Sequence, residues 1–164
     1  NLKNPKKSIE AINQGLLKNK NSERGYFLLG NAEIMLKNYN SALIAFKKSS
    51  KINSTFWQAI NNEGLILYEL NNPQKAISKF KSALEISQNA EPMLALAIVL
   101  FLYKNNQIES IQLAKNALIS NPKYVYKEYQ KEQLWGKKLQ QGAQILFKSK
   151  EMIQAVKEAK EKSQ

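Results

Sequence analysis

The stretch GNAEIMLKNYNSALIAF, residues 30–46, starts with a glycine inside a run that otherwise reads as helix. A glycine in a helix interior costs about 1 kcal/mol relative to alanine, so its presence needs a reason. When the chain is shifted against itself by 34 residues, this glycine and several later residues of the stretch meet identical residues. Three of the matched pairs are Gly30 and Gly64, Ala42 and Ala76, and Phe46 and Phe80. The stretch is therefore one unit of a repeat.

Two sets of helix-capping residues recur with the same spacing. The first set is Asn4, Asn38, Asn72 and Asn106, and the second is Asn21, Thr55 and Asn89. An asparagine side chain accepts a free backbone N–H at a helix start, and a following proline has no N–H to lose. Each unit is therefore predicted to be a pair of helices. The predicted ranges are 5–18, 22–36, 39–52, 56–70, 73–86, 90–104 and 107–120.

A two-helix repeat of 34 residues resembles the tetratricopeptide repeat (TPR) family. The first full unit matches the family pattern at Tyr26, Leu29, Gly30, Ala42, Phe46 and Ser49, and the second at Ile60, Gly64, Ala76, Phe80 and Ala83. In this family, small residues at the glycine and alanine positions let the two helices approach closely, which gives a reason for Gly30. The resemblance implies an all-α fold, a right-handed superhelix of stacked helix pairs.

The resemblance also implies the domain organisation. Residues 1–22 are the second helix of a partial repeat, 23–56, 57–90 and 91–124 are three full repeats, and 125–164 are C-terminal capping helices. The third repeat keeps only Leu94, Ala117 and Pro122 of the pattern. It is the most divergent, because Ile98 replaces the glycine, Ser110 the alanine and Ala114 the aromatic residue.

The repeat pattern stops after Pro122, but an apolar stripe continues. Residues 124–147 are predicted to be helical, with a bend at Gly136, and a last helix over 150–162 is predicted to be capped by Ser149. Terminal units of solenoids cover an otherwise exposed apolar face. We therefore interpret Trp135 as a core residue of a capping helix, with a binding anchor as the alternative.

The residue types present argue against catalysis. The chain has no Cys, His or Asp, and its 13 acidic residues are all Glu. This composition removes thiolate chemistry, imidazole bases, Ser-His-Asp arrangements and nearly all zinc sites. Neither GxGxxG nor GxxxxGK[ST] occurs. We expect no enzymatic activity, no cofactor and no metal.

The net charge of +12 comes from lysine, since Arg24 is the only arginine. This bias, with abundant Asn and Ile, fits an AT-rich genome. The lysines of the outer helices, among them Lys47, Lys48, Lys51, Lys75, Lys79 and Lys81, are interpreted as a solvated face. The alternative is a salt-sensitive contact with an anionic membrane or an acidic partner. We do not expect nucleic-acid binding, because no basic and aromatic stripe supports it.

The resemblance places a binding groove on the concave side, lined by the first helix of each unit. The groove residues that we expect to contact a peptide or helix of a partner protein are Arg24, Phe27, Asn31, Ile34, Asn61, Asn62, Leu65, Tyr68, Val99, Leu102 and Tyr103. Apolar side chains would anchor the segment, and the asparagines would hold its backbone through amide hydrogen bonds.

One TPR subgroup binds acidic chaperone tails through a clamp of cations, and this chain departs from that pattern. Asn31 and Asn62 match it, but Phe27, Pro92 and Leu96 occupy the positions where positive charges belong. A terminal carboxylate would lose its water there without gaining a cation. We therefore do not expect such tails to bind.

Two functions stay open at this point. The first is a scaffold, adaptor or assembly factor that binds a partner segment in the groove. The second is a structural part of a larger, membrane-anchored protein, whose groove is filled by its own C-terminal helices and whose basic outer face makes the contacts.

The chain begins with Asn inside a half-repeat, so we expect an N-terminal targeting or anchoring segment to be missing. We expect a location in the cytoplasm or at the periphery of a membrane. The stretch KEQLWGKKL also resembles the tail of some cyanobacterial TPR proteins, which would imply a role at a photosynthetic membrane. The sequence does not indicate an oligomeric state.

Overall fold

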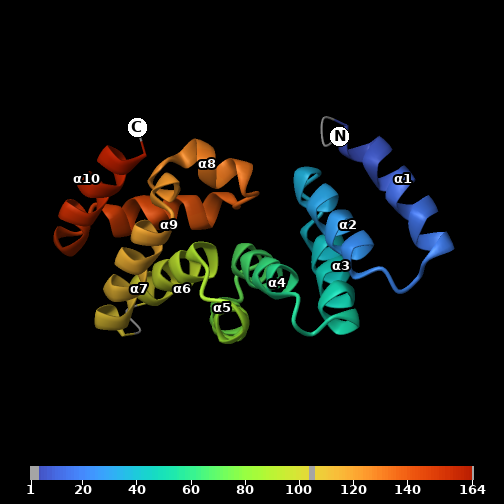
Figure 1. Cartoon of the computed structure of the whole chain (residues 1–164), viewed down its shortest axis with the longest axis horizontal. Helices are drawn as coiled ribbons and strands as arrows, with labels where there is room; N and C mark the ends of the chain where they lie inside the picture. Colours follow the sequence, from blue (N-terminus) through green and yellow to red (C-terminus); the bar gives the residue numbers. More distant parts are fainter. Residues whose placement is uncertain (1–3, 104–105, 164) are drawn as a thin grey trace.

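The structure of the chain is a computed structural model, and it describes residues 4–103 and 106–163. The repeat region consists of a single helix followed by three antiparallel pairs, and the described residues contain no strand. The single helix is α1 (Pro5–Lys18), and the pairs are α2 (Glu23–Met35) with α3 (Tyr39–Ile52), α4 (Trp57–Glu69) with α5 (Pro73–Ile86), and α6 (Ala90–Leu102) with α7 (Gln107–Ser120). The pairs stack side by side in chain order (Figure 1).

The seven repeat helices begin and end within two residues of the predicted ranges wherever the structure describes those ends. The predicted helix end at residue 104 and the first three residues of the partial repeat lie outside the described residues. The all-α, right-handed superhelical fold with C-terminal helices is confirmed.

Close packing of the two helices within a unit explains the glycine that opens the repeat. A Cβ atom on Gly30 would lie 2.5 Å from Cε1 of Phe46, and a Cβ atom on Gly64 would lie 2.6 Å from Cε1 of Phe80. Both phenylalanines are fully buried. The glycine is needed because the ring of the paired helix occupies the space of its side chain.

The prediction that every recurring asparagine caps a helix through its side chain is wrong in part. The side chains of Asn4 and Asn106 accept backbone N–H groups at the starts of α1 and α7. Asn38 and Asn72 lie at the N-cap positions of α3 and α5 but make no such bond. The Asn38 amide instead donates to Glu33 at 2.8 Å. In these two helices the start is therefore positioned without the side-chain cap.

The second set of capping residues is also shifted from its predicted role. The N-cap residues of α2 and α4 are Ser22 and Phe56, each one residue after the predicted Asn21 and Thr55. Asn89 is at the N-cap of α6 but makes no side-chain capping bond.

The segment after Pro122 does not form the single bent helix that the apolar stripe predicts. It forms a short 3-10 turn (Pro122–Val125), α8 (Lys127–Glu132), α9 (Lys137–Phe147), a second 3-10 turn (Lys150–Met152) and α10 (Ile153–Lys162). Leu134 has a φ angle of 61°, in the left-handed region, and the chain turns there between α8 and α9. Ser149 does not cap the last helix through its side chain.

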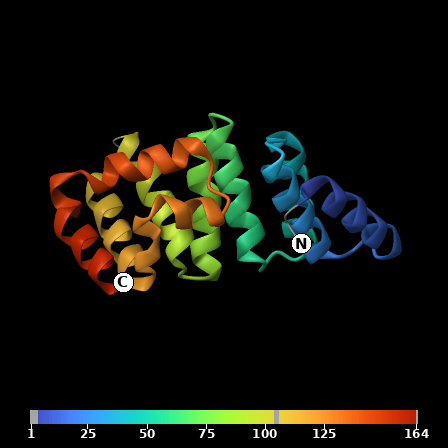
Figure 2. The ribbon, with the colours of Figure 1, turned by 90° about the horizontal axis from the view of Figure 1, so that it is seen from above.

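The C-terminal helices divide between the end and the concave side of the solenoid. Helix α10 packs against α7 and the first 3-10 turn, whereas α9 lies across α6 and α4 (Figure 2). Helix α6 is apolar on all sides and almost wholly buried, as expected for a helix covered on every face. None of the described helices is long and apolar enough to cross a membrane.

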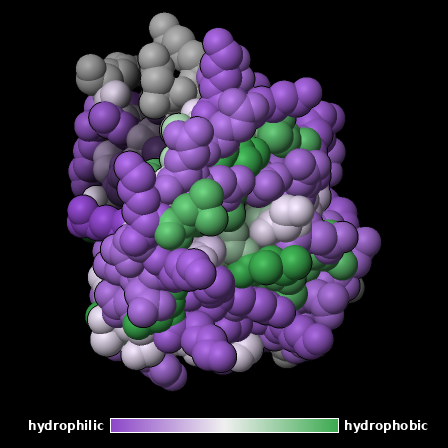
Figure 3. Space-filling view, turned by 90° about the vertical axis from the view of Figure 1, so that its right-hand side faces the viewer, coloured by the Kyte–Doolittle hydropathy of each residue, from purple (hydrophilic) through white to green (hydrophobic). Residues whose placement is uncertain are grey.

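The opposite end of the solenoid is less completely covered. Apolar side chains appear there between hydrophilic ones (Figure 3). The exposed large apolar residues of α1, α2 and α3 include Leu17, Leu28 and Ile44.

Candidate functional site

The concave side of the solenoid is divided into a half filled by the chain itself and an open half. Leu65, Tyr68 and Val99, three of the predicted groove residues, are buried in one apolar cluster with residues of α9. The α9 residues in that cluster are Leu139, Ala143 and Leu146. This wall of the groove is therefore part of the core.

The third repeat diverges from the pattern at a position where α9 packs against it. Ile98, which replaces the repeat glycine, is fully buried, and a Cβ atom on Gly142 of α9 would lie 2.5 Å from its Cγ2. The same Cβ would lie 2.8 Å from Cδ1 of Leu102. The isoleucine and the glycine are thus complementary in shape, and α9 fits closely onto α6.

Glu69, the last residue of α4, holds the start of α9. Its carboxylate accepts the backbone N–H groups of Lys138, at 3.1 Å, and of Leu139, at 3.2 Å. The Lys138 ammonium donates in turn to the Glu69 carbonyl oxygen at 2.8 Å. Burial raises the pKa of Glu69, and the two backbone N–H groups and Lys138 act against that rise. A carboxylate at the positive end of a helix is a stabilising arrangement.

The open half is a cavity of about 570 Å³ between α2, α4, the start of α6 and α8. Phe27, Asn31 and Asn62 are the predicted groove residues that line it. The full lining is Phe27, Asn31, Trp57, Gln58, Asn62, Asn89, Ala90, Glu91, Ser120, Asn121, Tyr124, Tyr129, Glu132, Gln133 and Leu134. One wall comes from the repeats and the other from the C-terminal segment.

The remaining predicted groove residues do not line this cavity. Asn61 is fully buried beneath it, and Ile34 is buried against Ala42 and Phe46. Arg24 and Tyr103 are exposed. Leu102 is partly buried against the main apolar cluster.

A chain of polar side chains runs along the floor of the cavity. The Asn62 amide donates to Asn31 at 3.2 Å, and the Asn61 amide donates to Asn62 at 3.4 Å and to Glu91 at 3.0 Å. The indole N–H of Trp135 donates to the other carboxylate oxygen of Glu91 at 2.8 Å. This network links α2, α4 and α6 to the turn before α9.

Glu91 is the most perturbed acid of the site. Burial raises its pKa to about 7, and the hydrogen bond from Trp135 acts in the opposite direction. Its partners are both neutral donors, so its charge is not balanced by a cation. The side-chain oxygen of the neighbouring Asn61 has no hydrogen-bond partner among the described residues.

Aromatic rings form much of the other wall. Tyr124 stacks on Trp135 with ring centroids 5.3 Å apart and meets Tyr129 edge-on at 4.9 Å. Trp135 is buried, which agrees with its interpretation as a core residue, although it lies in the turn between α8 and α9. Phe27, on the facing wall, packs on Phe46 and Phe56. The rings are thus held rigidly by other rings.

Sequence reasoning did not identify Glu91 or the α8 residues as parts of the site. Gln58 holds a groove position of the second repeat, so the repeat spacing does place it on the concave side, and it lines the cavity. Glu91 starts the third repeat, where no family groove position lies. Tyr129 and Glu132 lie after the repeats, and Tyr124 lies beyond Pro122, where the repeat pattern stops, so repeat spacing carries no information about them. The described residues contain no cluster of acidic side chains that could hold a metal.

Comparisons with known proteins give the fold. No family model matches the chain, and no curated protein matches it. Among solved structures, the chain is similar to MamA, with a TM-score of 0.69 and 18% identity over 94% of this chain and 86% of that one. A second MamA structure has a TM-score of 0.62 and 21% identity over 75% of this chain and 68% of that one.

The chain is also similar to YrrB, described as a TPR protein with an unusual peptide-binding site. The TM-score is 0.60, with 16% identity over 92% of this chain and 89% of YrrB. The chain therefore has the fold of TPR solenoids. These similarities do not support the cyanobacterial resemblance of the KEQLWGKKL stretch.

Proposed function

We propose that this chain is a protein-interaction scaffold that binds a peptide or helical segment of a partner in the open half of its concave groove. The observation that carries this proposal is the cavity of about 570 Å³, which the chain's own helices leave open beside the half that α9 fills. Its rigid rings and side-chain amides suit a segment that needs both apolar anchoring and backbone hydrogen bonds. The proposed role includes no catalytic step.

The two halves of the groove have different tasks in this proposal. Helix α9 closes the apolar half and stabilises the third repeat. Gln140 of α9 also donates to the carbonyl oxygen of Trp135, and the Trp135 ring supports Tyr124 in the second wall of the cavity, to which α8 contributes as well. The binding site is therefore made jointly by the repeats and the C-terminal segment, and an assembly factor would present it to one protein segment at a time.

A photo-crosslinking amino acid placed at Gln58 tests the proposal. Gln58 lines the cavity, and Gln74, exposed on the outer helix α5, is the matched control site. The proposal predicts an adduct with one defined segment of a partner protein from Gln58 and none from Gln74, with the segment identified by mass spectrometry. Adducts from Gln74 alone would contradict it.

The self-filled half of the groove favours a second candidate, in which the outer face makes the contacts and the chain lies at the periphery of a membrane. Lys47, Lys51 and Lys75 on that face are exposed, whereas Lys79 pairs with the buried Glu63 at 2.7 Å. Binding to vesicles of anionic lipid, lost in Lys47→Gln/Lys51→Gln and absent with neutral lipid, would support this candidate. Unchanged sedimentation of the variant with anionic vesicles would oppose it.

A further inference from the structure

The charge of the cavity is opposite to the charge of the chain. The chain carries 25 Lys and Arg residues against 13 Glu residues, for a net charge of +12. The described residues that line the cavity include Glu91 and Glu132 and no Lys or Arg. The lining is thus acidic in a chain that is strongly basic elsewhere, and this contrast indicates the charge of the occupant.

Glu91 has the capacity to bind a further donor. Each of its carboxylate oxygens accepts one hydrogen bond, from Trp135 at 2.8 Å and from Asn61 at 3.0 Å. A carboxylate oxygen has two lone pairs, so each oxygen can accept one more bond. The only ion pair of the described residues is between Lys79 and Glu63, away from this cavity. A cation that enters the cavity would be the first charged partner of Glu91.

The aromatic rings of the cavity suit the same kind of ligand. Trp57, Tyr124 and Tyr129 line the space together with the two carboxylates. The face of an aromatic ring attracts a cation, and a planar guanidinium both stacks on a ring and forks onto a carboxylate. An arginine side chain uses both features, whereas a lysine ammonium is a single point charge.

We infer that the cavity binds an arginine side chain in a basic segment of the partner, with the guanidinium against Glu91 and Glu132. This inference rests on the proposed function and names the partner's chemistry. The repulsion between a basic segment and the other charges of the chain is screened within about 8 Å at physiological salt. The affinity for the basic segment then depends on the contacts inside the cavity and not on the net charge of the chain.

A random-peptide library selected on the full chain tests the inference, at about 0.15 M salt and about pH 8, where the Glu91 carboxylate is ionised. The expected result is enrichment of peptides with arginine at one fixed position. Replacement of that arginine by glutamine should weaken an enriched peptide by about tenfold or more, measured by fluorescence anisotropy.

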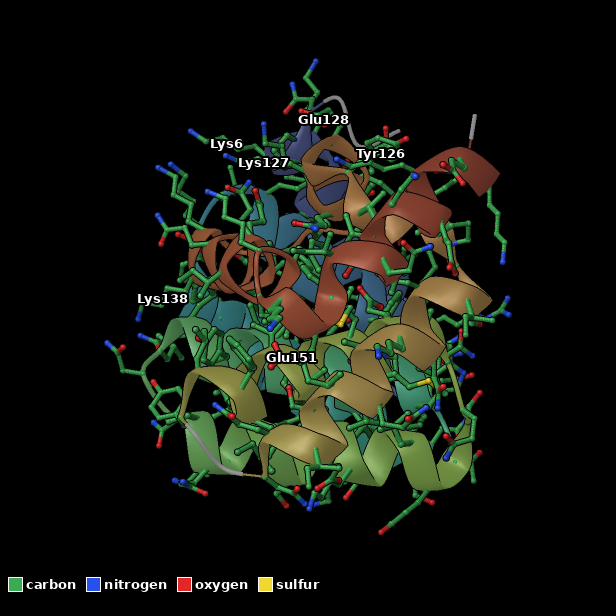
Figure 4. All side chains as sticks on the ribbon, turned by 90° about the vertical axis from the view of Figure 1, so that its left-hand side faces the viewer. Lys6, Tyr126, Lys127, Glu128, Lys138 and Glu151 are labelled. Carbon is green, nitrogen blue, oxygen red and sulfur yellow. The ribbon has the colours of Figure 1, made fainter. Side chains whose placement is uncertain are left out.

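Three variants complete the test, and each replaces one glutamate by glutamine and so removes one negative charge. Glu91→Gln and Glu132→Gln should each weaken the arginine peptide, Glu91→Gln by about tenfold. Glu128→Gln should leave it unchanged, because Glu128 is exposed on α8 and is not among the cavity residues (Figure 4). Glutamine at position 91 can still accept from Trp135, and Glu132 is exposed, so its variant carries little risk of misfolding.

The outcomes separate the inference from the proposed function. Enrichment of neutral or acidic peptides that lose binding on Phe27→Ala would overturn the inference and leave the proposed function standing. Absence of any enrichment over a Phe27→Ala/Asn62→Ala variant would overturn both. If the chain self-associates and Glu91→Gln abolishes the self-association, the occupant of the cavity is a second copy of the chain. This result would also overturn the inference.

Discussion

The carboxylate of Glu69 lies where a side chain on Gly136 would be. Gly136 is the N-cap residue of α9 and has no side chain to accept the free N–H groups of that helix. Glu69, at the end of α4, accepts two of them instead. The start of α9 is therefore capped by a residue from the second repeat, and this contact fixes the C-terminal segment in the groove.

Gly136→Ala should displace the Glu69 carboxylate and destabilise the protein by on the order of 1 to 3 kcal/mol, because the N–H groups of α9 lose their acceptor. Urea unfolding followed by circular dichroism measures this. Gly15→Ala is the control, since a Cβ atom there meets no atom within 4 Å. It should stabilise α1 by up to about 1 kcal/mol. Equal effects of the two substitutions would contradict the capping role of Glu69.

Ala42 and Ala76, the small residues of the second helix in each unit, are fully buried. Replacement of either by Phe should overpack the contact between paired helices and cost about 1 to 3 kcal/mol. Differential scanning calorimetry of both variants measures the loss. Unchanged unfolding temperatures in both would refute the repeat register.

The pKa of Glu91 gives stability a defined pH dependence. Because burial raises it from 4.5 to about 7, the folded state holds a proton in this range that the unfolded state releases. This contribution to stability is present below about pH 4.5 and is lost as the pH rises through about 7. Glu91→Gln removes it.

The wild-type protein should therefore lose stability relative to Glu91→Gln by on the order of 2 to 3 kcal/mol between about pH 5 and about pH 8. Urea unfolding of both proteins at the two pH values measures the difference. Glu69, whose pKa is also raised, is present in both proteins and cancels in the comparison. Parallel pH profiles of the two proteins would show that Glu91 does not titrate in this range.

Deletion of residues 149–164 should destabilise the protein but leave the cavity in place. Met152 and Ala159 are buried in the main apolar cluster, so removal of α10 exposes apolar surface of α7. None of the cavity residues lies in the deleted segment. The expected result is a lower unfolding midpoint in urea with peptide binding retained. Loss of binding by a truncated protein that is still folded at low urea would place a binding contact in α10.

The repeat helices were predictable because their signals are local. A glycine 16 residues before a phenylalanine, and an asparagine at the start of the second helix, are read within a single unit. The prediction of side-chain capping bonds was only partly correct, because tertiary packing also positions a helix start. Asn38 and Asn72 stand at such starts without a capping bond. The continuous apolar run from Met93 to Phe101 indicates that α6 is buried on every side.

The position of α9 was not predictable, because an apolar stripe fits equally well against the end of a solenoid or inside its groove. The contacts that decide between the two join residues far apart in the chain, such as Glu69 with Lys138 and Glu91 with Trp135. Helix α10, which packs against α7 and the first 3-10 turn, lies outside the groove. The helix inside it is α9.

In our interpretation, α9 is a fixed part of the fold, and the partner uses the open half of the groove beside it. The double variant Ile98→Cys/Gly142→Cys tests whether α9 stays in place, because these positions are in contact and the chain has no other cysteine with which a disulfide could form. Binding of the same peptide, selected on the full chain, is measured before and after reduction. We expect equal affinity in the oxidised and reduced forms. Loss of binding in the oxidised form, restored by reduction, would show instead that a partner must displace α9.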